Sequence, residues 1–178
     1  MPKKSPLRLV ARKLTKLEMN ELLKDAIDEP IGVTKGEKFE LFFENFMAQQ
    51  EGFVYIDKHC RSKVGEIDYF YRSKLRGHPL WEKFPYLFIE CKNWKENISS
   101  EKMDHFIELV EAKTIFPCCG VYVTTSSFSQ QALTAMRDAR IKGKVIVVPI
   151  DKNDLPDLID KGFEILVQEK CDKIIAKT

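Results

Sequence analysis

Apolar residues recur at helical spacing in the first strongly patterned segment of the chain, between residues 34 and 52. Its apolar positions are Phe39, Phe42, Phe43, Phe46 and Met47. Positions three and four apart lie on one face of a helix, so this segment predicts an amphipathic helix that ends near Gly52. Thr34 and Glu37 have the spacing of a capping box, which predicts that the helix begins there.

Shorter apolar runs downstream predict strands at 53–56, 64–72, 86–92, 119–125 and 145–150. Two more helices are expected, one capped by Ser99 or Ser100 and one over 130–140. Their inward-facing residues would be Met103, Phe106, Ile107 and Val110 in the first and Ala132, Leu133 and Met136 in the second. The Gly- and Pro-containing segment 73–85 predicts a long connection. A short helix-like segment at 154–160 precedes a mixed tail. This order of elements indicates an α/β protein, with a mixed sheet and helices on its faces.

The length of 178 residues suits one domain of ordinary size, and 44% apolar with 31% charged residues excludes a disordered chain. We expect a basic N-terminal extension over residues 1–33 and a main domain over residues 34–178. A short helix is plausible at about 16–26, with Leu17, Leu22 and Leu23 as its apolar positions. No apolar run approaches the ~20 residues of a membrane span. Five cysteines without CxxC spacing favour the reducing cytoplasm.

The net charge of +2 does not by itself indicate a nucleic-acid-binding protein, but the distribution of charge is more informative. Basic residues are concentrated in residues 1–24 and on both sides of the segment 65–71. The candidates for contact with a polyanion such as DNA are Lys58, Arg61, Lys63, Lys74 and Arg76. Basic stretches on both sides of an acidic site suit a polyanion held over a metal. Each stretch alone is equally typical of solvated loops.

Four charged residues lie on the second and third predicted strands. Residues two apart on a strand share a face, so Glu66 and Asp68 project together, and so do Glu90 and Lys92. Sequential strands are usually neighbours, which would bring three carboxylates and one ammonium to one patch. The residues between them would face the core on the other side; these are Ile67, Tyr69, Ile89 and Cys91. An ion pair at an exposed strand end is the alternative for Glu90 and Lys92.

Carboxylates at close range repel one another, and a divalent cation removes that repulsion. Oxygen ligands without His or Cys favour Mg²⁺ or Mn²⁺ over zinc. A metal held by two carboxylates keeps several waters, one of which can attack a phosphodiester. A nearby ammonium can orient that water or neutralise charge on a phosphoryl oxygen. The set therefore predicts metal-dependent phosphodiester hydrolysis.

The helix over 34–52 offers a further carboxylate. Glu37, Glu40 and Glu44 form a stripe beside its phenylalanine face. We choose Glu40, close to the apolar border, as the residue that reaches the sheet, because Glu37 has an alternative role as a capping residue and Glu44 one on a solvated face. Glu66 is a secondary candidate, either as a metal or water ligand or as a partner of nearby Lys63 or Arg72.

Several motifs resemble a known family. GEID at 65–68 and ECK at 90–92 look like the PD-(D/E)XK nuclease signature. GEKFELFF, GVYVTTSSFSQQAL and VIVVPIDKNDLPDLI resemble the conserved helix, the strand with its following helix, and the closing strand of Mrr-type restriction endonucleases. Their order and spacing match from about residue 36 to residue 160.

The resemblance implies a restriction-endonuclease-like three-layer fold with an αβββαβ core and DNA cleavage with Mg²⁺ or Mn²⁺. Matched by position, Asp68 and Glu90 would be the metal ligands together with the backbone carbonyl of Cys91. Lys92 would be the catalytic lysine, and Glu40 the acidic residue of the helix.

Three functions are compatible with these residues. The first is a metal-dependent DNA endonuclease, related to restriction or defence. The second is a Holliday-junction-resolvase-like or repair nuclease with the same site, and the third is a non-catalytic DNA-binding module with the same fold. Cutting both strands generally needs two sites, so we expect a homodimer. His59, His78 and His105 have no mutual spacing that indicates a triad, and we assign none of them to catalysis.

Overall fold

The computed structural model describes residues 13–113 and 115–176. Within these ranges the chain forms a five-stranded mixed sheet in the order β1-β2-β3-β4-β5. The strands are β1 (Phe53–Ser62), β2 (Gly65–Ser73), β3 (Tyr86–Lys92), β4 (Cys118–Thr124) and β5 (Val145–Ile150). β1, β2 and β3 pair antiparallel, whereas β3, β4 and β5 pair parallel.

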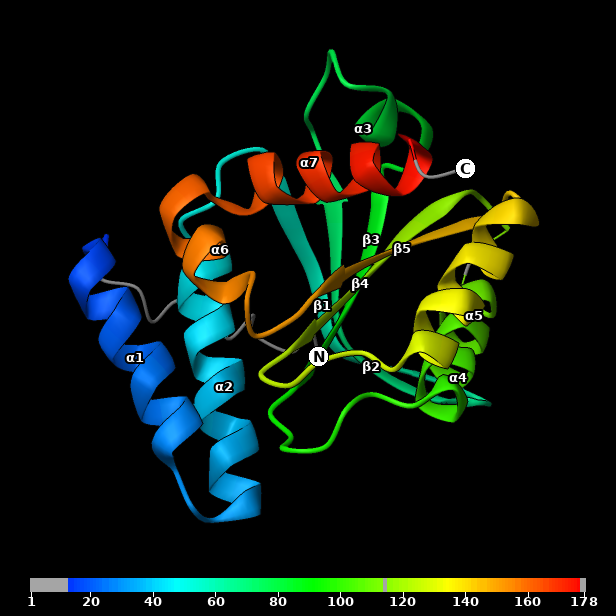
Figure 1. Ribbon diagram of the computed structural model, residues 1–178. Coiled ribbons are helices and arrows are strands. Elements are labelled where there is room, and N and C mark those ends of the chain that lie inside the picture. The colour runs from blue at the N-terminus through cyan, green and yellow to red at the C-terminus, as the bar shows by residue number, and fades with distance from the viewer. Residues whose placement is uncertain (1–12, 114, 177–178) are drawn as a thin grey trace, which may run out of the picture.

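Helices cover both faces of this sheet (Figure 1). The helices are α1 (Lys16–Asp28), α2 (Gly32–Met47), α3 (Pro79–Lys83), α4 (Ser100–Glu111), α5 (Gln130–Ile141), α6 (Leu155–Lys161) and α7 (Phe163–Ala176). The core on one face is formed with α4 and α5, and the core on the other with α1, α2, α6 and α7. β4 is buried along its whole length because both of its faces are covered. The order α2, β1 to β3, α4, β4 confirms the predicted three-layer fold with its αβββαβ core.

The start of α2 differs from the prediction. The helix begins at Gly32, and its N-cap Ile31 makes no side-chain hydrogen bond. Thr34 therefore lies inside the first turn and does not act as the cap. The capping box belongs instead to α1, where the Thr15 hydroxyl accepts from the Glu18 amide and the Glu18 carboxylate accepts from the Thr15 amide.

Two segments are more regular than their sequence patterns suggest. β1 continues to Ser62, well past the predicted end at residue 56, because its second half forms a hairpin with β2 down to the pair Ser62 and Gly65. The tail expected to be mixed forms α7, which buries Phe163, Leu166 and Val167 in the core. Both elements depend on tertiary partners, which a local pattern does not contain.

The helix expected at 16–26 is confirmed as α1, but its buried face differs. Leu17 is 70% exposed, and Leu133 of α5, also expected to face inward, is 40% exposed. α1 instead buries Met19, Leu23 and Ala26. The division of the chain into an extension and a main domain at residue 33 stays a prediction, and residues 1–12 lie outside the described ranges.

Candidate active site

The backbone ladder between β2 and β3 ends at the pair Tyr69 and Ile89. Beyond it, two amides donate to carboxylates of the opposite strand. The Cys91 amide donates to Asp68 Oδ2 at 2.8 Å, and the Asp68 amide donates to Glu90 Oε2 at 3.4 Å. Each carboxylate is thus held by the neighbouring strand, at the place where the two strands cease to pair.

Lys92 completes this group, which we call the site cluster: Asp68, Glu90 and Lys92. Its Nζ lies 2.5 Å from Glu90 Oε1 and 3.6 Å from Asp68 Oδ2. Glu90 and Lys92 share a face of β3 because they are two residues apart. The structure therefore brings together the three side chains that the sequence selected, while their catalytic roles stay predictions.

Burial dominates the electrostatics of the site cluster. Asp68 is 9% exposed and Glu90 8% exposed. Burial raises the pKa of Asp68, although Lys92 and the Cys91 amide act against it. Burial, followed by the charge of Asp68, raises the pKa of Glu90 to about 7. Burial alone would lower the pKa of Lys92, but the two carboxylates outweigh it and the pKa is raised. One ammonium thus does not compensate for two buried carboxylates.

The predicted alternation of faces holds along β3 but fails along β2. Tyr69, Ile89 and Cys91 belong to the core beneath α2, as expected. Ile67 packs instead with the core beneath α4, so the prediction for its face is wrong. β2 remains paired with β1 in this region, with Cys60 opposite Ile67 and Lys58 opposite Tyr69.

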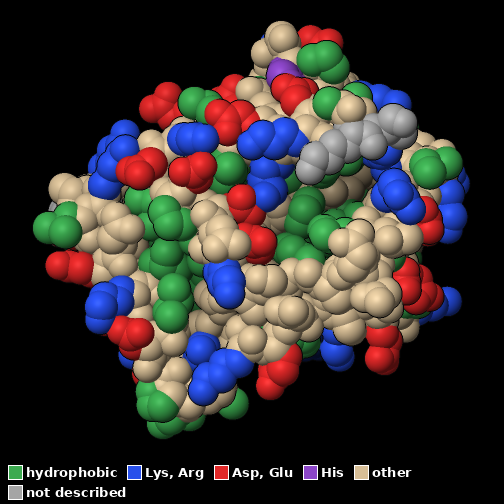
Figure 2. All heavy atoms as spheres, in the orientation of Figure 1, with side chains coloured by type: hydrophobic (Ala, Val, Ile, Leu, Met, Phe, Trp, Pro, Cys, Tyr) green, Lys and Arg blue, Asp and Glu red, His purple; other side chains and the backbone are tan. Residues whose placement is uncertain are grey.

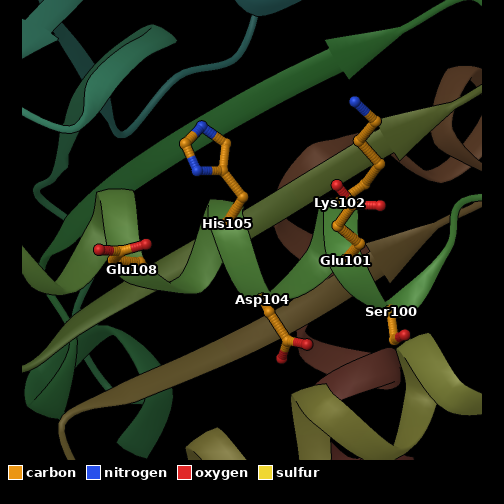
Figure 3. A pocket seen from close by; sticks show the side chains of 6 residues that line it. All are labelled: Ser100, Glu101, Lys102, Asp104, His105 and Glu108. Carbon is orange, nitrogen blue, oxygen red and sulfur yellow. The ribbon is translucent and has the colours of Figure 1, made fainter.

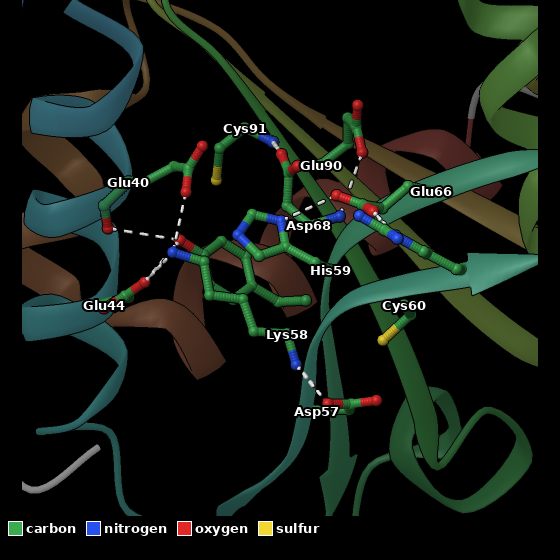
Figure 4. Close-up of polar contacts among 12 residues, drawn as sticks. Glu40, Glu44, Asp57, Lys58, His59, Cys60, Glu66, Asp68, Glu90 and Cys91 are labelled. Carbon is green, nitrogen blue, oxygen red and sulfur yellow. Dashed lines mark hydrogen bonds and ion pairs between the residues drawn. The ribbon is translucent and has the colours of Figure 1, made fainter. Parts of the chain in front are cut away.

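Glu40 and Glu44 face β1, where Lys58 lies between them (Figure 4). The Lys58 Nζ is 2.9 Å from Glu40 Oε2 and 2.6 Å from Glu44 Oε1. The Tyr69 hydroxyl donates to the same Glu44 oxygen at 3.2 Å. We call Glu40, Glu44 and Lys58 the α2 cluster.

The α2 cluster lies within electrostatic reach of the site. Burial is the main cause of the raised pKa of Asp68, and the charge of Glu40 adds to it. Glu40 is engaged in an ion pair with Lys58, and its role at the site stays a prediction. Glu37 is exposed in the N-terminal half of α2.

Glu66 is held away from the site cluster by β1. Its Oε2 accepts from Arg61 Nε at 2.7 Å, and its Oε1 lies 3.0 Å from His59 Nδ1. The hydrogen bond from Arg61 lowers the pKa of Glu66. Of the two roles considered for Glu66, the structure shows the partner of basic residues, but the partners are Arg61 and His59 and not Lys63 or Arg72. The expectation of three converging carboxylates on the sheet is thus corrected to two.

The basic candidates do not all lie at the site. Lys58 and Arg61 are on β1 beside it, and each is paired with carboxylates. Lys63 is exposed in the turn between β1 and β2. Lys74 and Arg76 follow the opposite end of β2, about 20 Å from the site along a strand that rises ~3.3 Å per residue. The predicted flanking of the site by basic stretches on both sides is therefore not observed for Lys74 and Arg76.

Two features of the surface concern the binding of a polyanion such as DNA. On the face shown in Figure 2, Lys and Arg side chains are interspersed with Asp and Glu. A hollow of about 660 Å³ along the exposed face of α4 is lined by Glu101, Asp104 and Glu108 together with Lys102 (Figure 3). Carboxylates on this face of α4 disfavour phosphate, and none of the site cluster lines it.

The surroundings of two residues near the site were not apparent from the sequence. Lys58 was grouped with basic residues, and its role in binding Glu40 and Glu44 required knowing that β1 lies beside α2. His59 was set aside because it has no histidine partner at a useful spacing. The hairpin could have identified it. Because β1 continues to Ser62 and pairs with β2, His59 lies opposite Asp68.

In the part of the chain that the structure describes, no group of three or more His, Cys, Asp or Glu side chains is arranged to hold a metal ion. None of the described helices has the length and apolar character needed to cross a bilayer. All five cysteines are free, buried thiols.

The sheet order and the flanking helices define a protein with a restriction-endonuclease-like fold. The family model described as restriction endonuclease, Mrr_cat, matches residues 33–159, and the chain belongs to this family of Mrr-type restriction endonucleases. This confirms the family resemblance and supports a nuclease.

Other comparisons add little. A search of curated proteins gives no match. Among solved structures, SfsA of Pyrococcus furiosus in complex with Ca²⁺ is 14% identical, with a TM-score of 0.33, over 67% of this chain and 56% of that one. The MspJI restriction endonuclease in complex with a 27-mer oligonucleotide is 17% identical, with a TM-score of 0.42, over 79% of this chain and 30% of that one. This chain thus spans little more than half of the first and under a third of the second.

Proposed function

We propose that this protein is a metal-dependent DNA endonuclease that hydrolyses phosphodiester bonds, in restriction or another defence against foreign DNA. The observation that carries the proposal is the site cluster: two buried carboxylates from neighbouring strands with one lysine over both. Membership of the restriction endonuclease family supports the same reading.

The residues of the site cluster fit a hard divalent cation. Both Asp68 and Glu90 present carboxylate oxygens, which are the ligands that Mg²⁺ and Mn²⁺ prefer. Burial is the main cause of the raised pKa values of both carboxyls, and a cation bound between them would favour their charged forms. We assign Asp68, Glu90 and the carbonyl of Cys91 as the residues that would hold it. When bound, the ion supplies a Lewis acid and an activated water.

The other charged residues then have distinct roles. Lys92 keeps its positive charge, and its ammonium is placed to orient the attacking water or to neutralise a phosphoryl oxygen. Glu40, whose carboxylate is paired with Lys58, would be an auxiliary group and would act after exchanging part of this contact. Water is excluded from one side of the site by the core that contains Tyr69 and Cys91.

A binding module without catalysis is less well supported. Buried charges are costly unless they have a use, and a site that had lost its chemistry would not need to keep three of them together. A resolvase-like or repair nuclease would use the same cluster, and no feature of the described residues favours branched DNA.

The experiment is plasmid cleavage with Mg²⁺, with Mn²⁺ and with a chelator, using wild type, Asp68→Ala and Lys92→Ala. Asp104→Ala, in the acidic hollow on α4, is the matched control because it removes an exposed carboxylate of the same kind. We expect metal-dependent nicking by wild type and the control, and none by the other two variants. Nicking that persists in Asp68→Ala would contradict the proposal.

The same cleavage assay measures substrate preference. Modified, unmodified and branched DNA distinguish a restriction-type enzyme from a junction or repair nuclease.

We also propose that the protein acts as a homodimer in the cytoplasm, so that two sites cut the two strands. Light scattering with and without a short duplex measures the dimer.

A further inference from the structure

His59 has an unusual backbone conformation next to the site. Its φ is 54°, and among the described residues it is the only one besides glycines with a positive φ. A side chain with a Cβ rarely adopts this left-handed region, because its Cβ crowds the following carbonyl. The residues on either side pair regularly with β2, Lys58 with Tyr69 and Cys60 with Ile67. The distortion is thus confined to the position opposite Asp68.

The imidazole of His59 is held by the neighbouring carboxylate. Its Nδ1 lies 3.0 Å from Glu66 Oε1, and the other oxygen of Glu66 accepts from Arg61. A carboxylate at Nδ1 fixes the ring with its Nδ1 hydrogen on that side and leaves Nε2 for another partner. Within the described residues, Nε2 makes no hydrogen bond, and the side chain is 47% exposed.

The ring also lies close to the site cluster. In the hairpin, Lys58 pairs with Tyr69 and Cys60 with Ile67, so His59 lies opposite Asp68. Figure 4 shows the ring between Glu66 and the space that Glu40 and Asp68 border. A phosphodiester bound over Asp68 and Glu90 would therefore come within reach of Nε2.

A purely structural role does not account for these features. Gly or Asn adopts the left-handed region at lower cost than His, and a half-exposed ring contributes little to the core. Strained residues persist where the surrounding structure holds them, and they are concentrated at functional sites.

We infer that His59 is a further catalytic residue, whose Nε2 contacts the phosphate of the scissile bond. Glu66, fixed by Arg61, is its positioning residue. This inference rests on the proposed endonuclease function, since it concerns the same site.

The test replaces His59 with glycine, which accepts the left-handed backbone without strain and opens space for a free imidazole. Cleavage of a saturating duplex is measured for wild type, His59→Gly and His105→Ala, each with and without added imidazole. His105 is an exposed histidine on α4 and serves as the matched control. Thermal unfolding of all three proteins measures folding separately.

We expect His59→Gly to unfold at or above the wild-type temperature and to cleave about 10- to 100-fold more slowly, the loss of one hydrogen bond to a charged group. Added imidazole should restore part of the rate in this variant alone, and His105→Ala should match wild type. Because a structural role would not respond to imidazole, rescue identifies the ring itself.

Three results would overturn the inference. If wild type cleaves and His59→Gly cleaves equally fast, the phosphate contact is wrong while the proposed function stands. If the variant loses activity together with thermal stability and imidazole does not restore it, His59 is structural. If wild type does not cleave any DNA with Mg²⁺ or Mn²⁺, the proposed function fails and this inference fails with it.

Discussion

Two groups of two carboxylates and one lysine lie side by side in this molecule, and they are balanced differently. In the α2 cluster, Lys58 lies within 3 Å of both Glu40 and Glu44, at 2.9 and 2.6 Å, and the Tyr69 hydroxyl adds a hydrogen bond. In the site cluster, Lys92 is 2.5 Å from Glu90 but 3.6 Å from Asp68, and both carboxyls are almost fully buried.

The two clusters differ in how far their carboxylate charges are compensated, and this indicates which one would bind a further cation. The carboxylates of the α2 cluster are about a quarter exposed and share a close ammonium, so their charges are compensated by water and by Lys58. Those of the site cluster have raised pKa values that Lys92 does not offset. Both clusters contain two carboxylates and one lysine. Because they differ in burial, one is a stabilising ion-pair network and the other is a candidate metal site.

Removing a carboxylate from the site cluster should have the largest effect. Asp68→Asn keeps the size of the side chain but removes a metal ligand, so cleavage should fall by about 10³-fold or more, equivalent to losing several kcal/mol of metal-derived stabilisation. Single-turnover cleavage with saturating Mg²⁺ measures it. Glu44→Gln in the α2 cluster is the matched control, and an equal loss in both variants would remove the distinction between the clusters.

Removing the ammonium should have the next largest effect. Lys92→Met keeps the apolar stem of the side chain and should slow cleavage by about 10²-fold, because a charge that acts on the transition state is lost. The same change should strengthen binding of Mn²⁺, since the two carboxylates lose their only close cation. Titration calorimetry measures the affinity for Mn²⁺, which should rise in this variant although cleavage is slower. Weaker Mn²⁺ binding would show that Lys92 does not compete for the carboxylates.

Neutralising one carboxylate in each cluster should change stability in opposite directions. Folding raises the pKa of Glu90 from 4.5 to about 7, so its favourable contribution is present below about pH 4.5 and is lost as the pH rises through about 7. In metal-free protein at pH 8, Glu90→Gln should therefore stabilise the fold by about 1–3 kcal/mol. Glu44→Gln should destabilise it by roughly 1 kcal/mol, because Lys58 loses a partner.

Denaturant unfolding in the presence of a chelator measures both variants. Stabilisation by Glu90→Gln should shrink toward zero at about pH 4.5, where the wild-type carboxyl is protonated. A destabilising Glu90→Gln at pH 8 would show that Lys92 compensates the buried charge fully, and the contrast between the clusters would be lost.

The smallest expected effect concerns Glu40, which connects the two clusters. Glu40→Gln should slow cleavage by about 10-fold or less, since its ion pair with Lys58 keeps it auxiliary, and a single supporting interaction contributes about 1 kcal/mol. Cleavage by Glu40→Gln is compared with that by Glu44→Gln. A loss as large as that of Asp68→Asn would place Glu40 among the metal ligands.

Much of this architecture was predictable because it follows from local patterns. The amphipathic face of α2, the apolar runs of β3 and β5 and the serine cap of α4 appear in the structure with small changes of boundary. Asp68, Glu90 and Lys92 were found because residues two apart share a face of a strand and successive strands pair.

What was not predictable depends on contacts between distant segments. The second half of β1 carries mostly polar residues and is a strand only because β2 pairs with it. Glu66 was counted with the site because alternation alone does not show that Arg61 and His59 lie across the hairpin. The packing of Ile67 in the core beneath α4 likewise depends on tertiary contacts, which the periodicity of β2 does not show.

The most direct measurement of the central claim is the position of a bound ion. Crystals soaked in Mn²⁺ and measured at a wavelength where manganese scatters anomalously should show a peak between the carboxylates of Asp68 and Glu90, and the peak should vanish in Asp68→Asn. An ordered peak elsewhere in the molecule, with none between these two side chains, would contradict the account.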